Sequence, residues 1–263
     1  MPKGIWIISL EVIPLNLEPF IFDCEVFAYD WLFVFKNKVT GEYTEIWNDN
    51  EAVEQFMTQE PLLAGFNNKH YDQFILKAVL SGFTPEEIKT VNDFIIVGGH
   101  EGWEYAPLRD CGIFFDQYDL MDDCQMGLSL KAIEAHLGMD IRETTVPFNI
   151  DRPLTEDEKR EVEFYCRHDV DATDRLDDLR QGYLSSKLTL GREKGLYPAK
   201  ALYMTNAKLT AAYLDAEQKP HYDEREYQYP PKLLRQYIPQ EVFDFLSRPA
   251  RGAWIEMQAL TLK

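Results

Sequence analysis

The sequence predicts an α/β protein in which helices flank a mixed β-sheet, followed by a mainly helical C-terminal extension. Three apolar or aromatic segments near the N-terminus have the length and composition of strands, and helical and strand-like segments alternate after them. A long helix then begins near Thr155, and the pattern stays helical beyond Gly182. With 45% hydrophobic and 13% aromatic residues, the chain of 263 residues can bury a substantial core.

The chain is expected to begin its fold with three antiparallel strands. Pro19–Phe27 is mostly apolar and aromatic, which indicates a buried strand. Trp31–Phe35 and Tyr43–Trp47 have the same character, and the turn-like Lys38–Glu42 lies between them. The composition therefore predicts a strand followed by a hairpin.

The alternation that follows predicts four helices and two further strands. The helices are expected at Asn50–Thr58, Tyr71–Leu80, Thr84–Ile96 and Leu128–Leu137, and the strands at Leu62–Phe66 and Gly112–Leu120. The next helix is the best specified of all, because Thr155 and Glu158 form a capping box just after Pro153. This helix is expected to run to about Leu179.

Two domains are expected, one of residues 1–180 and a mainly helical extension of residues 181–263. A polar, proline-bearing linker is predicted at Glu217–Pro231, and a further helix at Tyr237–Phe245. The two parts differ in charge: of the 27 Lys and Arg residues, 12 lie in 181–263, against 9 of the 45 Asp and Glu residues. Residues 1–180 thus hold 15 basic and 36 acidic residues, so the formal charge of −18 is concentrated in the first part.

Composition also excludes several classes of protein. No apolar run approaches the length of a membrane span, and the N-terminal apolar stretch is too short for a secretory signal. The four cysteines, Cys24, Cys111, Cys124 and Cys166, form no C-x-x-C pair, which argues against a zinc ribbon or a redox dithiol. We expect a soluble, cytoplasmic protein with reduced cysteines, no membrane partner, and an acidic part suited to binding metal cations.

Asp23 and Glu25 are the first candidate metal ligands. They occupy alternate positions of one predicted strand, so their side chains point to the same face. Two carboxylates in an apolar strand repel each other and lose hydration unless a cation compensates them. The alternative is an edge strand whose acidic pair faces water. The same D-x-E spacing at Asp49…Glu51 and Asp215…Glu217 lies in polar surroundings and needs no such explanation.

Asp72 is the second candidate, and it follows Asn68 and Tyr71 at the junction between a predicted strand and a helix. An aspartate at this place is often only a residue that favours the start of a helix. Likewise, Asn68 alone could be an ordinary turn residue. The segment gains significance only in combination with the other acidic positions.

Tyr165 and Asp169 lie four residues apart on the long helix and therefore on one face. The other positions of that face are apolar, so Asp169 is expected to lie in the stripe that packs on the sheet. A metal would explain an aspartate there, and a pair with Arg or a backbone donor is the alternative. Tyr118…Asp122 repeats the spacing in a strand-like context, where the two side chains are too far apart for one site.

The ordered set of these segments resembles the DEDDy exonucleases, whose motifs are D-x-E, N-x-x-[FY]-D and Y-x-x-x-D. Here they are Asp23-Cys24-Glu25, Asn68-Lys69-His70-Tyr71-Asp72 and Tyr165-Cys166-Arg167-His168-Asp169. Phe164 stands where the DEDDh variant has histidine. Ser129-Leu130-Lys131-Ala132-Ile133 and residues 165–173 are similar to the exonuclease domain of family B DNA polymerases, particularly phage-type ones. The resemblance covers about residues 18–180.

The resemblance implies an RNase H-like fold and a two-metal 3′→5′ exonuclease with Mg²⁺ or Mn²⁺. Asp23, Glu25 and Asp169 would hold one metal, Asp23 and Asp72 the second, and Tyr165 would orient the attacking water. The residues implied to contact a single-stranded DNA 3′ end are Asn68, Tyr71, Ser129 and Leu130. Phe66 and Phe27 are further hypotheses, as base-stacking platforms, and Arg142, Arg152 and Lys159 are hypotheses for an assisting basic residue.

No polymerase motif occurs in the sequence, so the chain is expected to proofread for a polymerase module present in cis or in trans. The chain is either a stand-alone protein or the front part of a longer one, and we favour the second, with residues 181–263 as the start of the polymerase part; if it is phage-encoded, it acts in the host cytoplasm. Two alternatives stay open. One is an RNA-trimming exonuclease similar to RNase D, and the other is a catalytically silent module that binds nucleic acid or protein.

Overall fold

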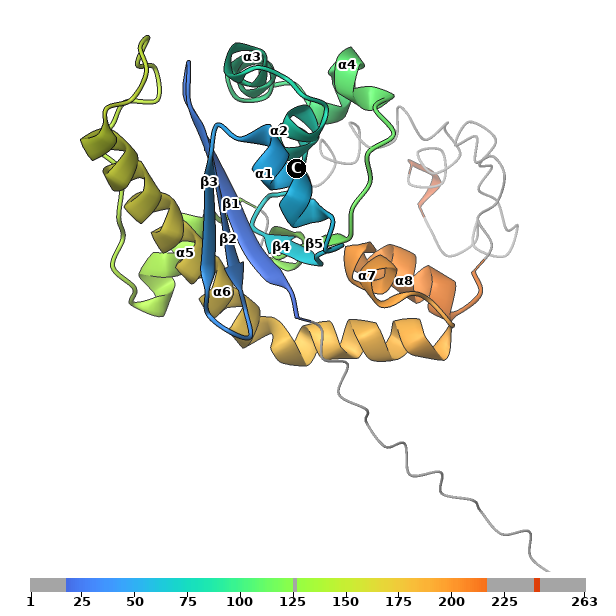
Figure 1. Cartoon of the computed structure of the whole chain (residues 1–263). Coiled ribbons are helices and arrows are strands. Elements are labelled where there is room, and N and C mark those ends of the chain that lie inside the picture. Colours follow the sequence, from blue (N-terminus) through green and yellow to red (C-terminus); the bar gives the residue numbers. More distant parts are fainter. Residues whose placement is uncertain (1–17, 125–126, 217–238, 242–263) are drawn as a thin grey trace, which may run out of the picture. The chain divides into compact units, whose positions relative to one another are not determined.

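The computed structural model describes residues 18–124, 127–216 and 239–241, and within them the α/β prediction is confirmed (Figure 1). A five-stranded sheet has the order β3-β2-β1-β4-β5. The strands are β1 (Phe20–Val26), β2 (Trp31–Asn37), β3 (Tyr43–Trp47), β4 (Leu63–Gly65) and β5 (Gln117–Asp119). β1, β2 and β3 pair antiparallel, whereas β4 is parallel to both β1 and β5, so the sheet is mixed.

Helices cover both faces of the sheet, with one set before β5 and another after it (Figure 1). The first set is α1 (Asn50–Met57), α2 (Asp72–Leu80), α3 (Pro85–Ile96), a 3-10 turn at Gly102–Glu104 and α4 (Ala106–Arg109). The second set is a 3-10 turn at Met121–Asp123, α5 (Leu130–Leu137), α6 (Glu156–Glu193), α7 (Pro198–Tyr203) and α8 (Asn206–Tyr213). None of the described helices is long and apolar enough to cross a membrane.

Two hydrophobic cores lie on opposite faces of the sheet. The even-numbered residues of β1, such as Phe22, pack with α1, α2 and α3. The odd-numbered residues Ile21 and Phe27 pack instead with Val162 and Val170 of α6. β1 is therefore an interior strand with both faces covered, as expected for a strand with a parallel neighbour.

Local sequence explains where several helices begin and end. Thr155 and Glu158 form the predicted capping box at the start of α6, and Thr84 and Glu87 form another at the start of α3. α5 ends at Gly138, which adopts a left-handed conformation with φ of 67°. The bounds of β3 coincide with the predicted Tyr43–Trp47.

Two predicted boundaries are wrong. The strand expected at Gly112–Leu120 is only Gln117–Asp119, because β4 offers just three residues for β5 to pair with. The long helix continues past Leu179 to Glu193, because Leu184 and Gly191 extend its buried face against the helices that follow. The predicted division at residue 180 falls inside α6, and the compact unit to which α6 belongs ends at Leu214. The linker predicted at Glu217–Pro231 lies outside the described residues, and so does most of Tyr237–Phe245.

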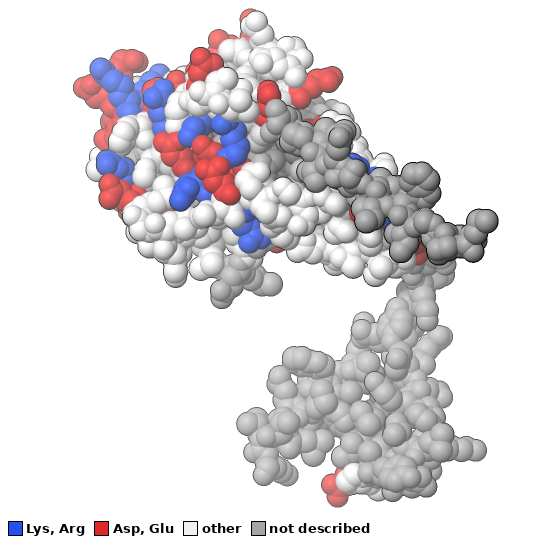
Figure 2. All heavy atoms as spheres, turned by 90° about the horizontal axis from the view of Figure 1, so that it is seen from below, with Lys and Arg blue, Asp and Glu red and all other residues white. Residues whose placement is uncertain are grey.

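An ion-pair network joins β2 to α6. Lys36 contacts Asp171 and Asp174 at 2.7 Å each, and Lys38 contacts Asp174 at 2.6 Å. Lys38 also reaches Asp177 at 3.0 Å. Figure 2 views the molecule from below and shows acidic and basic side chains intermingled rather than in separate patches. Both lysines therefore have aspartate partners on α6 within the fold.

We predict that Gly191 is required for the close approach of α6 and α7. A Cβ atom at Gly191 would lie 2.4 Å from the Ala201 Cβ, closer than real Cβ contacts. Gly191→Ala should lower the free energy of unfolding. Overpacking costs about 1–3 kcal/mol, whereas the higher helix propensity of alanine stabilises the helix by at most about 1 kcal/mol. Urea unfolding would measure the difference.

Gly182 provides the matched control on the same helix. A Cβ atom there meets no other atom within 4 Å. Gly182→Ala should therefore stabilise the protein by about 0.5–1 kcal/mol. A stabilised Gly191→Ala variant would contradict the tight α6–α7 packing.

Candidate metal centre

β1 places Asp23 and Glu25 on the side of the sheet that faces α6. Their odd-numbered neighbours Ile21 and Phe27 belong to the core under that helix. Glu25 is only 9% exposed, and β1 lies between β2 and β4 in the sheet. The alternative of an edge strand with water-facing acids is therefore wrong. Burial of two carboxylates on one strand creates a charge conflict that needs compensation.

Asp72 reaches the same region from the turn between β4 and α2. β4 ends at Gly65, and Asp72 is the first residue of α2 and 3% exposed. The Cys24 thiol donates to Asp72 Oδ1 at 3.1 Å, which ties Asp72 to β1. The carboxylate is thus directed toward the end of β1 where Asp23 and Glu25 lie.

A buried aspartate holds this turn in place. The oxygens of Asp119, at the end of β5, accept hydrogen bonds from the backbone N–H groups of Asn67 at 2.9 Å, Lys69 at 3.0 Å and Met121 at 2.8 Å. Asn67 has φ of 66°, a left-handed conformation that asparagine tolerates better than most residues. These bonds fix the path of the chain just before Asp72.

Asn68 supports the turn as well. Its side chain is fully buried and hydrogen-bonds with the Gln117 side chain at 2.8 Å. It also packs against Gly65, where an added Cβ would lie 2.8 Å from the Asn68 Cβ. The predicted substrate contact is therefore corrected: Asn68 has no exposed atom with which to make it and instead positions Asp72.

α6 supplies Asp169, Tyr165 and Cys166 to the same region. Asp169 is 7% exposed and accepts a hydrogen bond from the Lys131 ammonium group of α5. Lys131 also contacts Glu134 at 3.3 Å and lies 4.9 Å from the centre of the Tyr165 ring. Asp169 therefore has a basic partner, as the alternative to a metal proposed, but this partner is a lysine. One lysine does not neutralise four carboxylates.

The side chains meet closely enough to bind an ion. Ligand atoms of Asp23, Glu25 and Cys166 lie within 4.8 Å of one another, which is a spacing suited to a shared metal. The pKa of Asp23 is raised well above its ordinary value, first by burial and then by the charges of Asp72, Glu25 and Asp169. Asp23, Glu25 and Cys166 therefore form a group that could hold a cation, and the charges of Asp72 and Asp169 act on it.

The other acids show the same conflict. Burial raises the pKa of Glu25, and the charges of Asp169 and Asp72 raise it further. Burial raises the pKa of Asp72 to about 6, despite the hydrogen bond from Cys24 that opposes the shift. Burial also raises the pKa of Asp169, and Lys131 acts in the opposite direction. A divalent cation among these groups would favour their ionised forms and remove the conflict.

Three of the four carboxylates line one of two cavities. One cavity of about 450 Å³ is lined by Asp23 and Asp169 together with Phe66, Ser129 and Leu130. The other, of about 380 Å³, is lined by Glu25 and Tyr71, whose hydroxyl donates to Asn92 Oδ1 at 2.7 Å. The structure therefore brings Tyr71, Ser129, Leu130 and Phe66 beside the acids.

Other predicted residues lie elsewhere. Phe27 is fully buried and stacks on Phe148 with ring centroids 5.2 Å apart, so the hypothesis that it stacks on a base is wrong. The candidate basic residues have other partners: Arg142 lies over the Phe164 ring, Arg152 pairs with Glu158, and Lys159 pairs with Asp30. None of the three contacts the acidic cluster in the described structure.

Sequence reasoning missed Lys131 and Cys166 as neighbours of the acids. Lys131 lies in the Ser129–Ile133 segment, from which only the serine and the leucine were predicted to belong to the site. Its position on the first turn of α5, directly beside those two residues, could have suggested it. Cys166 lies three residues before Asp169, a helical spacing that places both on one face. Its thiol lies 3.8 Å from Asp23 Oδ2.

Comparison with known proteins gives no family for this chain. No protein-family model matches it, and no curated protein matches its sequence. Its chemistry is therefore inferred from its own residues and their geometry.

We predict that the metal-free protein loses stability as the pH rises. A carboxyl group whose pKa is raised by folding binds its proton more tightly in the folded state, so stability falls from about pH 4 through about pH 6. Asp72 alone should contribute a loss on the order of 3 kcal/mol. Urea unfolding in EDTA at pH 5 and pH 7.5 would measure it, and Asp72→Asn should reduce the difference.

A divalent cation should reverse this trend. Added Mn²⁺ should raise the unfolding midpoint strongly at pH 7.5, where the acids must be ionised, and weakly at pH 5. Equal stabilisation at the two pH values would count against binding at the acidic cluster.

Proposed function

We propose that this chain is a metal-dependent 3′→5′ exonuclease that shortens single-stranded DNA and proofreads for a DNA polymerase. The observation that carries the proposal is the convergence of Asp23, Glu25, Asp72 and Asp169, from three separate elements, on one buried cluster beside a cavity. Structural acids are normally paired with bases or exposed to water, whereas these repel one another. We also propose an RNase H-like fold, which the order β3-β2-β1-β4-β5 and the mixture of pairings support.

The residues fit Mg²⁺ or Mn²⁺ ions. Carboxylate oxygens are the ligands that these hard cations prefer. Asp23, Glu25 and Asp169 would hold one ion, and Asp23 and Asp72 the other. Cys166 would remain a neutral thiol beside them, since burial and the charge of Asp23 raise its pKa. When bound, two such ions supply charge stabilisation and an activated water for an in-line displacement at phosphorus.

Tyr165 and Lys131 complement the carboxylates. Burial and the charges of Asp169 and Glu25 raise the pKa of Tyr165, so its hydroxyl stays protonated and can orient the attacking water. Lys131 supplies the positive charge nearest to Asp169, where the anionic phosphate must approach. A cation that takes over Asp169 would leave the ammonium group free to contact that phosphate.

The cavity on the Asp169 side fits the end of a single strand. Phe66 and Leu130 give it apolar and aromatic walls, and Ser129 adds a hydroxyl beside Asp23. Such walls contact bases of any sequence, as proofreading requires. A polymerase module in cis or in trans would deliver the strand. An RNase D-like enzyme would use the same centre on RNA, so the choice of sugar is left to experiment.

We predict that Asp23→Asn and Asp169→Asn each abolish stepwise shortening of a 5′-labelled DNA oligonucleotide. Asparagine keeps the shape of the side chain but removes the charge that holds the metal, so the rate should fall by more than about 100-fold. Gel analysis with Mg²⁺ or Mn²⁺, beside an RNA of the same sequence, would measure the rates. Asp157→Asn is the matched control, because Asp157 lies on α6 with its side chain almost fully exposed.

The pattern of products decides between the candidate functions. A ladder that shortens from the 3′ end, is lost with EDTA and is faster on DNA supports proofreading. A faster reaction on RNA would transfer the proposal to RNA trimming. An intact oligonucleotide under all metal conditions would refute nuclease activity and favour a silent binding module.

We further predict that Tyr165→Phe separates chemistry from metal binding. Loss of the hydroxyl should lower kcat by about 10- to 1000-fold, a range typical for one oriented polar group. Mn²⁺ affinity measured by calorimetry should stay close to that of the unaltered protein. A parallel loss of Mn²⁺ affinity would instead assign Tyr165 to holding the metal site together.

A further inference from the structure

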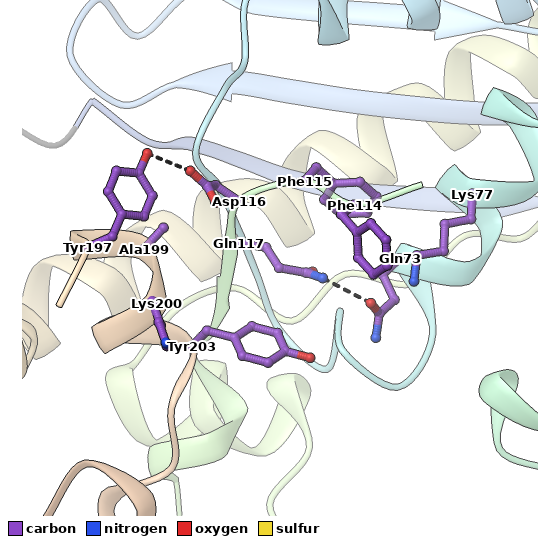
Figure 3. A pocket seen from close by; sticks show the side chains of 10 residues that line it. All are labelled: Gln73, Lys77, Phe114, Phe115, Asp116, Gln117, Tyr197, Ala199, Lys200 and Tyr203. Carbon is purple, nitrogen blue, oxygen red and sulfur yellow. Dashed lines mark hydrogen bonds between the residues drawn. The ribbon is translucent and has the colours of Figure 1, made fainter. Parts of the chain in front are cut away.

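A groove away from the metal centre crosses α2, α7 and residues 114–117 (Figure 3). It consists of two adjoining cavities of about 390 and 490 Å³, both lined by Gln73, Lys77 and Tyr203. Gln117 donates to the Gln73 side-chain oxygen at 2.9 Å, which joins β5 to α2 within the groove. All of these residues belong to the compact unit that ends at Leu214.

Lysines outnumber acidic residues in the lining of the groove. Lys77, Lys200 and Lys208 line it, and none has an ion-pair partner among the residues that the structure describes. Lys77 is half-buried, and burial lowers its pKa, as expected for a cation without a carboxylate beside it. Lys36 and Lys38, by contrast, are bound to the aspartates of α6.

Three acids also line the groove. Asp122 is bound by Lys69, and Asp116 accepts a hydrogen bond from the Tyr197 hydroxyl at 2.7 Å. Glu101 lies 3.5 Å from the ring of His70. The lysines thus outnumber the acids by one, so in a chain with a net charge of −18 the groove is a place where an anionic ligand can find lysines without carboxylate partners in the described structure.

Exposed aromatic rings accompany the lysines. Trp103 is 59% exposed, Tyr203 47%, Tyr197 61% and Phe114 89%. Cations alternating with exposed rings match the chemistry of a single-stranded nucleic acid, which presents phosphates and stackable bases in turn. A double helix would offer only phosphates, because its bases are already stacked on one another.

The groove and the cavity beside the carboxylates are lined by neighbouring residues of the same two loops. Phe66, Asn67 and Met121 line the cavity of the metal centre, and Lys69, His70 and Asp122 line the groove. The same two loops thus form the walls of both, and the bonds to Asp119 hold these loops together. A strand whose 3′ end lies at the acids can cross these loops into the groove.

We propose that this groove binds the single-stranded DNA upstream of the 3′ end, several nucleotides away from the acids. The proposal rests on the proposed exonuclease function, which supplies the strand. Lys77, Lys200 and Lys208 contact its phosphates, and Trp103 and Tyr203 stack on its bases. The protein should therefore bind strands that span the groove and the metal centre more tightly than very short strands.

Binding of fluorescent oligothymidylates in EDTA tests the groove without any turnover. A strand of about 20 nucleotides spans both regions, whereas one of about four reaches only the metal centre. The variant Lys77→Gln/Lys200→Gln/Lys208→Gln should weaken binding of the long strand at least about tenfold and leave the short one unchanged. Its salt dependence, log K against log salt, should lose about 2 in slope, since each phosphate contact on a single strand contributes about 0.7.

Two further variants separate the groove from general effects. Lys200→Gln/Lys208→Gln changes only exposed residues, so a partial effect is expected even if the half-buried Lys77 is needed for folding. Arg109→Gln/Arg142→Gln/Arg160→Gln removes the same charge from exposed positions outside the groove and should leave binding nearly unchanged. Trp103→Ala should weaken binding of the long oligothymidylate but not of an abasic strand of equal length, whereas Phe164→Ala should affect neither.

The outcomes distinguish this proposal from the exonuclease itself. Equal weakening by the lysine and arginine triple variants would overturn it, because only net charge would then matter. Long-strand affinity unchanged in the lysine variant would also overturn it and leave the groove to a protein or peptide partner, even if the chain degrades DNA. Groove-dependent binding without any degradation would sustain the groove and refute the exonuclease.

Discussion

The burial of four carboxylates around β1, at the turn before α2 and on α6, is the constraint on which the rest of the structure depends. Burial raises the pKa values of Asp23, Glu25, Asp72 and Asp169, and the charges of neighbouring acids raise those of Asp23 and Glu25 further. The surrounding fold must hold them together despite this destabilising burial. The β1 pairing, the turn fixed by Asp119 and the anchoring of α6 at its capping box all serve that purpose.

The sequence predicts those parts of the fold that depend on neighbouring residues. The capping box at Thr155 and the strand Tyr43–Trp47 were found at their places, because a cap or an apolar strand is encoded within a few residues. The short β5 and the continuation of α6 were not, because the first depends on the length of β4 and the second on packing against α7.

The candidate site shows the same difference between features encoded by neighbouring residues and features that depend on packing. The four acids could be chosen because their spacing along a strand or helix predicts a common face, and their order along the chain supports the choice. Lys131 could not be chosen in this way, since its approach to Asp169 depends on how α5 packs on α6. Arg142, Arg152 and Lys159 were closer in sequence to Asp169, yet their side chains have partners elsewhere. Asn68 matched a motif, but its full burial gives it a supporting role.

The length of α6 bears on how this chain could be divided without loss of its fold. Its 38 residues extend about 57 Å, so one rigid rod carries Asp169 in one half and packs against α7 and α8 with the other. Truncation at residue 180 would cut this helix and remove Leu184 and Leu202 from the hydrophobic core beneath it. The smallest autonomous fragment should therefore extend through Tyr213, so that α6 keeps both helices that pack on its second half.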